Sequence, residues 1–391
     1  MATNVNLIRN TRLFFTTNVD APTGRWRGYN NWDGGTSTPA EPTTTTNTVE
    51  IQVLDGFSFS QNTTSDTITL NEAGPTPIRG QRSFNTALEP ADFSFSTYIR
   101  PKAGTNATSA EESVLWDAIS NGGWSQLDTS YATATVDFDD SNEHQLTKFA
   151  LIMCIDNDTF VLQNCVLDQA SIDFGIDAIA TVAWTGKAAR LEKLSTSLIL
   201  TDDEANSQVT FTGGPTGVSG NAKLKDTTAY YIANKLSLCT IGYNSKSYTV
   251  GITGGNLTIN NNVTYLTPAN LGVVNLPITY FTGTRAVSGN VTAYLKSGEL
   301  TDTSSLLADL LANADNTTEP DVEVDIDIGG SQIPTVKLFC AHAVAQIPTV
   351  SSESVMSTTI NFTAQGYSTA FDVTETNELV ITYKAADPVA P

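Results

Sequence analysis

The sequence predicts a mainly β protein made of two tandem modules, each a β-barrel or sandwich with one short helix. Residues 89–101 (EPADFSFSTYIRP) alternate apolar and polar side chains, which is the period of a strand with one buried face. A similar alternation returns in residues 287–298 (VSGNVTAYLKSG). Charged residues make up only 16% of the chain, and the abundant Thr, Ser, Asn and Gly favour strands and turns over helices.

Six elements recur in the same order in the two halves, which indicates a tandem duplication. The pairs are 6–17 with 231–241, 49–62 with 249–262, 89–101 with 287–298, 110–121 with 303–314, 136–154 with 324–340, and 171–186 with 355–366. The pair 110–121 and 303–314 carries the helical pattern, and the other elements are predicted to be strands.

The repeat divides the chain into a first module at 1–190, a linker at 191–228 and a second module at 229–391. Residues 18–48, rich in Gly, Pro and Thr, have no counterpart and are predicted to be an inserted surface loop. A small hairpin is expected near 209–212 in the linker, and one more strand near 378–383 in the C-terminal tail.

The alternation also assigns side chains to faces. Among the residues of 89–101 and its counterpart, the predicted buried core consists of Phe93, Phe95, Ile99, Val291 and Leu295. Residues 171–186 are predicted to form one continuous strand close to 50 Å long, at about 3.3 Å per residue. Its polar face would carry Asp173, Asp177 and Thr181, and the matching face of 355–366 would carry Thr359, Asn361 and Thr363.

Charge and motifs argue against most other classes of function. A net charge of −21 with a pI near 4.3 disfavours phosphate-binding surfaces, although it is compatible with a surface along which DNA slides without adhering. The four cysteines lie far apart among apolar residues, as expected for buried reduced thiols, so we predict no metal site. No phosphate loop, dinucleotide fingerprint or nucleophile motif occurs in a supporting context, so neither a cofactor nor a catalytic site is expected.

The start of the chain shows no secretion signal, and no stretch approaches 18 consecutive apolar residues. The expectation is therefore a chain that folds in the cytoplasm and has no membrane anchor.

The segments NLIRNTRLFFTTNV, VLDGFSFSQNTTSDTITL and EPADFSFSTYIRP, with the helix that follows, resemble the tail tube proteins of contractile-tailed bacteriophages. The resemblance is best over residues 1–190 and extends to 230–385 as a diverged second copy. It implies a small β-barrel or sandwich flanked by one helix, whose copies form six-fold rings stacked around a lumen that conducts DNA.

This resemblance implies a structural protein of the virion tail, assembled in the host cytoplasm, and not an enzyme. Its partners would be further copies of itself, the tail sheath, the baseplate and the tail-terminator protein, with the tape measure protein and phage DNA passing through the lumen. Because each chain carries two modules, three chains would complete one pseudo-hexameric ring. The polar faces described above would then line the lumen.

Two alternatives stay open at this stage. A baseplate hub or tube-initiator ring would use the same modules and the same ring closure. A glycan-binding or glycan-cleaving tail fibre is a less favoured reading, since such proteins carry aromatic and carboxylate clusters on short repeats, whereas the repeat here is long and globular.

Overall fold

The computed structural model describes residues 11–17, 19, 24, 26, 48–68, 82–103, 108–127, 133–138, 145–155, 158–193, 198–203, 208–213, 229–271, 273–312, 321–330, 333–351, 355–366 and 377–385. Most of the predicted insertion 18–48 and much of the predicted linker 191–228 lie outside these residues. In the described part of the linker, β14 (Leu198–Asp203) and β15 (Gln208–Gly213) pair as a hairpin, which includes the segment 209–212.

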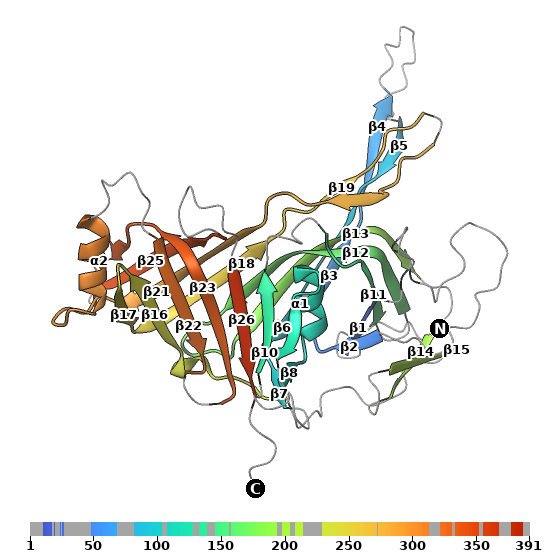
Figure 1. The fold of residues 1–391 in the computed structure, drawn as a ribbon. Coiled ribbons are helices and arrows are strands. Elements are labelled where there is room, and N and C mark those ends of the chain that lie inside the picture. Colours follow the sequence, from blue (N-terminus) through green and yellow to red (C-terminus); the bar gives the residue numbers. More distant parts are fainter. Residues whose placement is uncertain are drawn as a thin grey trace.

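The predicted mainly β fold is confirmed (Figure 1). The first half contains β1 (Thr11–Thr16), β2 (Thr48–Ile51), β3 (Ser58–Ser60), β4 (Thr63–Ile68), β5 (Arg82–Leu88), β6 (Ala91–Tyr98), β7 (Pro101–Ala103), β8 (Thr108–Ala110), α1 (Ser113–Ser120), β9 (Trp124–Leu127), β10 (Thr133–Phe138), β11 (Phe149–Ile155), β12 (Asp158–Asp173) and β13 (Thr181–Lys193).

The second half contains a 3₁₀ turn, η4 (Asn234–Leu236), β16 (Leu238–Tyr243), β17 (Lys246–Val250), β18 (Ile252–Asn260), β19 (Thr264–Leu266), β20 (Thr279–Phe281), β21 (Ala286–Tyr294), α2 (Thr303–Ala312), β22 (Asp321–Ile328), β23 (Thr335–Ala345), β24 (Thr349–Ser351), β25 (Ser357–Ala364) and β26 (Leu379–Lys384).

One antiparallel sheet layer runs without interruption through both halves, in the order β3–β6–β13–β12–β18–β21–β25–β24. We call it the continuous sheet. The joint between the halves is the pairing of β12 with β18, where Gln169 lies opposite Asn260 and Asp173 opposite Asn256. The C-terminal part of β12 therefore provides the second half with its neighbouring strand.

A second layer joins the halves in another order, β9–β10–β26–β23–β22–β16–β17. The tail strand β26 lies between β10 of the first half and β23 of the second. The two layers enclose a hydrophobic core that extends through both halves. Trp116 on α1 packs edge-on against Trp184 on β13, with 4.6 Å between ring centroids.

The predicted single strand at 171–186 is wrong. Asp173 ends β12 and Thr181 begins β13, and the two lie opposite each other across a hairpin whose turn is 174–180. The apolar parity continues through this turn in Phe174, Ile176 and Ala178, although Ile176 is 41% exposed, so this parity gave no sign of the reversal. Ile179, 40% exposed, departs from the alternation because it falls on the polar parity. The matched prediction at 355–366 corresponds to the single strand β25.

Candidate functional surface

The continuous sheet has one buried face and one polar face. Because the strands pair in register, alternate residues of every strand align on the same side. We call this side the polar face; it comprises Ser58, Ser60, Asp92, Ser94, Ser96, Tyr98, Gln169, Ser171, Asp173, Thr181, Ala183, Thr185, Lys187, Asn256, Thr258, Asn260, Ser288, Asn290, Thr292, Thr359, Asn361 and Thr363. None of these side chains is fully buried.

Hydrogen bonds between neighbouring strands order the polar face. The hydroxyls of Ser171 on β12 and Thr258 on β18 lie 3.0 Å apart, directly across the joint between the halves. Asn256 Nδ2 donates to Ser171 Oγ at 3.3 Å, and Asn290 Nδ2 on β21 donates to Asn256 Oδ1 at 3.1 Å. These four side chains thus bond one another, which leaves fewer of their hydrogen-bonding groups free for a passing ligand.

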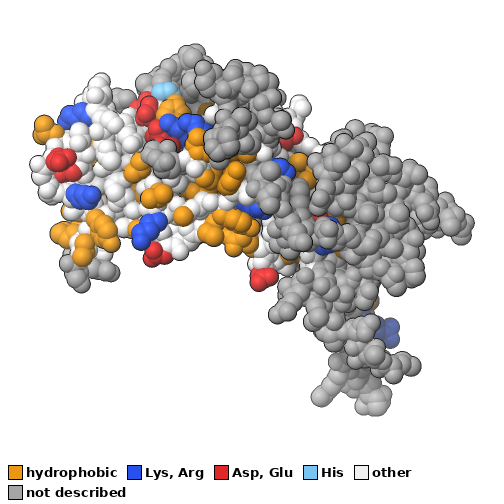
Figure 2. All heavy atoms as spheres, turned by 90° about the horizontal axis from the view of Figure 1, so that it is seen from below, with side chains coloured by type: hydrophobic (Ala, Val, Ile, Leu, Met, Phe, Trp, Pro, Cys, Tyr) orange, Lys and Arg blue, Asp and Glu red, His pale blue; other side chains and the backbone are white. Residues whose placement is uncertain are grey.

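The polar face carries few charges. Asp92 and Lys187 form an ion pair, with 2.9 Å between Oδ1 and Nζ, and Asp173 stands alone at the end of β12 among uncharged neighbours. Figure 2 shows another view, the underside of the molecule, where Lys and Arg side chains lie among Asp and Glu side chains in the part that is described. Among the described residues, neither the polar face nor the underside carries a continuous row of Lys and Arg that would bind nucleic acid.

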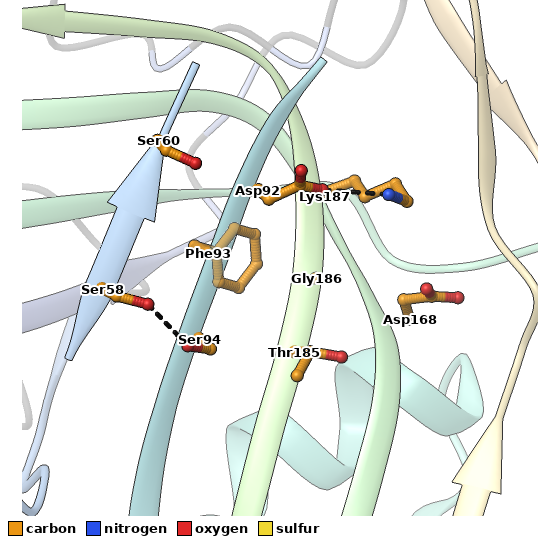
Figure 3. Close-up of a pocket in the computed structure, with 9 residues that line it drawn as sticks. All are labelled: Ser58, Ser60, Asp92, Phe93, Ser94, Asp168, Thr185, Gly186 and Lys187. Carbon is orange, nitrogen blue, oxygen red and sulfur yellow. Dashed lines mark hydrogen bonds and ion pairs between the residues drawn. The ribbon is translucent and has the colours of Figure 1, made fainter. Parts of the chain in front are cut away.

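A hollow of about 220 Å³ opens on the polar face where β3, β6, β13 and β12 meet (Figure 3). Ser58 and Ser94 bond each other through their hydroxyls at 2.7 Å, and Lys187 is held by Asp92. Asp168 accepts the N–H of Val263; burial raises the pKa of Asp168, and this bond and Lys187 lower it less. The hollow therefore offers hydrogen-bonding groups, and among the described contacts none of its serine hydroxyls is hydrogen-bonded to a carboxylate or a histidine that would activate it as a nucleophile.

Six residues were predicted for the polar face that would line the lumen, and five of them lie on the observed polar face: Asp173, Thr181, Thr359, Asn361 and Thr363. Asp177 does not, because it falls in the exposed turn between β12 and β13. The polar residues of β18 and β21, such as Asn256 and Asn290, lie on the same face, although the sequence analysis did not assign them to the lumen.

Phe93, Phe95, Ile99 and Val291 are at most 2% exposed and lie in the core. Leu295 is only half-buried, because β21 ends at Tyr294 and its backbone continues toward the surface. Val291 corresponds to Thr97 of the first half and not to one of its phenylalanines. Val291 lies opposite Ile360 on β25, as Thr97 lies opposite Val182 on β13.

The two edges of the continuous sheet are incomplete. Within the described residues, β3 pairs only with β6, and β24 only with β25. Phe57 and Phe59 beside the first edge are half-buried, whereas Leu257 and Ile259, in the corresponding strand β18, are 0% exposed. The difference is that β18 pairs with β12 on this side, whereas β3 pairs with no further strand in the part of the chain that the structure describes.

The other edge shows the same asymmetry. Ile347, just before β24, is 52% exposed and Val350 on β24 is 42% exposed. Ile172, near the end of β12 where β18 pairs, is 0% exposed. At both edges of the continuous sheet, apolar side chains are therefore exposed to solvent, whereas the pairing of β12 with β18 buries the corresponding apolar side chains.

Two arms project from one end of the strands of this sheet (Figure 1). One is the hairpin β4–β5 and the other is the segment 264–281 with β19 and β20, and the two touch where Leu88 N–H donates to Asn275 O at 2.8 Å. Exposed apolar side chains gather on the arms: Ile68, Phe84, Leu266, Leu271, Val273, Val274, Leu276, Ile278 and Phe281. Such a concentration is typical of a surface that a partner covers.

The four cysteines are buried thiols. Burial raises the pKa of the thiols of Cys154, Cys239 and Cys340 to about 12, and raises that of Cys165 as well. Within the described ranges no three His, Cys, Asp or Glu side chains group as metal ligands. The described helices include none that is long and apolar enough to cross a membrane.

Comparison with known proteins identifies one curated relative. The chain is 30% identical, over an alignment of 403 residues, to "Tail tube protein pb6" of Escherichia phage T5, and the match covers 97% of this chain and 79% of that protein. No protein-family model matches the chain. A chain from the cryo-EM structure of the anti-feeding prophage baseplate, six-fold symmetrised, aligns with 32% of this chain and 86% of its own length, at 13% identity and a TM-score of 0.26.

Proposed function

This chain belongs to the family of phage tail tube proteins, and we propose that three copies close into one ring of six modules, which stacks with others into a tube that conducts DNA. The family membership makes it a structural component of the virion tail.

The pairing registers support a tandem duplication. In the first half Phe59, Phe93 and Gly186 lie side by side on β3, β6 and β13. In the second half the same row is formed by Ile259, Val287 and Ala364 on β18, β21 and β25. Neighbouring rows match as well, so the two halves share strand order and register as well as sequence pattern.

The observation that carries the proposal is the joint between β12 and β18. There the two halves of the chain pair through main-chain hydrogen bonds, which supports the same kind of attachment between successive modules. The second half has an edge equivalent to the end of β12. Gln346 N–H donates to Asn361 O at 2.9 Å there, so Gln346 lies beside Asn361 of β25 as Ser171 lies beside Ala183 of β13. The first module has an edge equivalent to β18, which is β3.

Repeating the joint between chains gives a definite register. Ser171 pairs with Thr258 across the in-chain joint, and Ser58 corresponds to Thr258 because each pairs with a serine on the next strand. Gln346 of one chain is therefore expected opposite Ser58 of the next chain. Such a head-to-tail contact closes into a ring when the rotation allows it, and two modules per chain make three chains sufficient for six modules.

A cysteine cross-link tests this register. Residues opposite each other on antiparallel strands have Cα atoms about 4.5–5.5 Å apart, which suits a disulfide. The Ser58→Cys/Gln346→Cys variant is expected to give covalent trimers on oxidation. The control is Ser58→Cys/Thr363→Cys, whose second cysteine lies on the same face but one strand inside the edge. Absence of intermolecular cross-links, or a ladder extending to six chains, would refute the three-chain ring.

We also propose that the polar face lines the lumen. Four of its side chains, Ser171, Thr258, Asn256 and Asn290, are hydrogen-bonded to one another, and the face carries few charges that would attract phosphates. These two properties favour DNA sliding past without adhering. Asp173→Lys is expected to leave rings and tubes intact but to slow DNA ejection. Glu323→Lys, an exposed change of equal charge on β22 in the other layer, is the control. Equal ejection rates in both variants would count against this face as the lumen wall.

Stacking is assigned to the arms. The β6 strand runs from the arms at Ala91 to Tyr98, and the opposite end of the sheet exposes Ile176, Ile179 and Tyr294. Arms of one ring would pack on this end of the next ring. Phe84→Asp is expected to yield rings that do not lengthen into tubes, as seen by electron microscopy.

Electron microscopy of the unmodified protein distinguishes the runner-up function. A hub or tube initiator would form single trimeric rings that do not stack on themselves, whereas the tube protein forms long tubes. The resemblance predicts that the tail sheath, the baseplate and the tail-terminator protein are partners of this chain. Isolation of intact tails in which a sheath surrounds this protein would test whether the tail is contractile.

A further inference from the structure

The C-terminal strand β26 has an unusual place in the fold. It is the last described strand, yet it is hydrogen-bonded on both sides. Ile381 of β26 lies opposite Val136 of β10 on one side and opposite Leu338 of β23 on the other. Its inward side chains Leu379, Ile381 and Tyr383 are 0% exposed. If β26 left its place, β10 and β23 would each present an unpaired edge, and the second layer would lose the strand between its two halves.

A chain of buried hydrogen bonds anchors β26 to the first half. The hydroxyl of Tyr383 donates to Glu112 Oε1 at 2.7 Å and accepts the indole N–H of Trp116 at 2.7 Å. Glu112 immediately precedes α1, and Trp116 lies in its first turn. All three residues are at most 1% exposed.

The other charged groups near Glu112 have partners elsewhere. The backbone N–H of Arg100 donates to both carboxylate oxygens of Glu112 at 3.3 Å, while its guanidinium binds Gln52 Oε1 and the carbonyl of Ala229. The neighbouring Glu111 pairs with Lys102 at 3.4 Å. No cation bonded to the Glu112 carboxylate is found among the described contacts, so its charge is balanced by hydrogen bonds alone.

We propose that Glu112, Trp116 and Tyr383 form a pH-sensitive latch that holds the C-terminal strand between the two halves. The latch is closed most firmly when Glu112 is protonated. It opens more readily, releasing β26 from β10 and β23, as Glu112 ionises.

The direction follows from linkage. Burial raises the pKa of Glu112 from 4.5 to about 7, and the bonds from Tyr383 and from the backbone N–H groups lower it less. When β26 leaves, the carboxyl gains access to water and its pKa returns toward the ordinary value. A group whose pKa is higher in the closed state favours that state at low pH, and this advantage is lost as pH rises from about 4.5 through about 7.

Hydrogen exchange of β26 amides in the full-length chain measures the opening. With a pKa of about 7 closed and 4.5 open, the opening constant at pH 8 is expected to exceed that at pH 5 by about 70-fold, after correction for intrinsic exchange rates. Amides of β18, at the other joint between the halves, serve as the internal reference and are expected to change far less.

Two variants separate the latch from a general effect of pH. Glu112→Gln keeps an oxygen that accepts the Tyr383 hydroxyl but cannot ionise, so β26 exchange should lose its pH dependence. Tyr383→Phe should raise β26 exchange at both pH values while keeping a dependence on pH. The latch is ruled out if β26 exchanges equally at pH 5 and pH 8 in the natural chain, if Glu112→Gln retains the dependence, or if β18 and β26 change together.

Discussion

Replacing Phe95 by Ala should reveal which face of β6 supports the fold. Phe95 is 2% exposed, with ring centroids 6.2 Å from that of Phe57 and 6.3 Å from that of Phe93. Across the ladder it lies opposite Trp184, whose indole N–H donates to the Thr97 hydroxyl at 2.9 Å. Because this bond holds the indole in place, the cavity left by the missing ring cannot close by a simple shift of its largest neighbour.

The expected cost is about 3–5 kcal/mol of unfolding free energy, the usual range for Phe→Ala in a core that relaxes only partly. Urea unfolding of dissociated chains, monitored by tryptophan fluorescence, should show a lower midpoint with an unchanged slope. Ser96→Ala, the adjacent residue on the polar face, is the matched control and should change stability by no more than about 0.5 kcal/mol.

Equal and small effects of the two substitutions would refute the assignment of faces. A slip of one residue in the pairing of β6 exchanges its two faces, so Ser96 would then be the buried position. A large loss at both positions would also contradict the reasoning, since it would mean that the polar face is covered within the single chain.

Two further predictions concern buried polar groups. Glu378→Ala removes the carboxylate that lies 2.7 Å from Nε of Arg285, whose side chain is 2% exposed; breaking such an ion pair should cost about 3–5 kcal/mol in urea unfolding, and a loss below about 1 kcal/mol would contradict this. The thiols of Cys154, Cys239 and Cys340, whose pKa burial raises to about 12, should resist iodoacetamide at pH 8 in the folded chain and react after unfolding in urea. Rapid labelling of any of them in the folded chain would show that its site opens.

Strand faces could be predicted because they depend on local geometry. Successive side chains of a strand point to opposite sides, so the alternation in Phe93, Ser94 and Phe95 determines which residues meet the core whatever strand lies beside them. The same rule placed Thr359 and Asn361 on the polar face. The tail strand was also predicted close to its observed bounds, because β-branched and aromatic residues gather there.

The turn at 174–180 could not be found in this way. Phe174, Ile176 and Ala178 keep the apolar parity of the flanking strands, so exposed Ile176 looks like a core position in the sequence. The predicted burial of Leu295 was wrong for a related reason. The alternation shows which side of a strand a residue faces, but not the residue at which the strand leaves the core.

The amino-acid sequence by itself determined that this chain is mainly β and, for strands such as β6 and β25, which side is polar. Only the tertiary structure decided which strands are neighbours: β12 beside β18, and β26 between β10 and β23. It also decided that Glu112 is buried against Tyr383, a residue 271 positions away. The physical reason is that side-chain direction is a property of the local backbone, whereas strand pairing and the burial of a carboxylate arise from contacts between distant segments, whose choice depends on the packing of the whole chain.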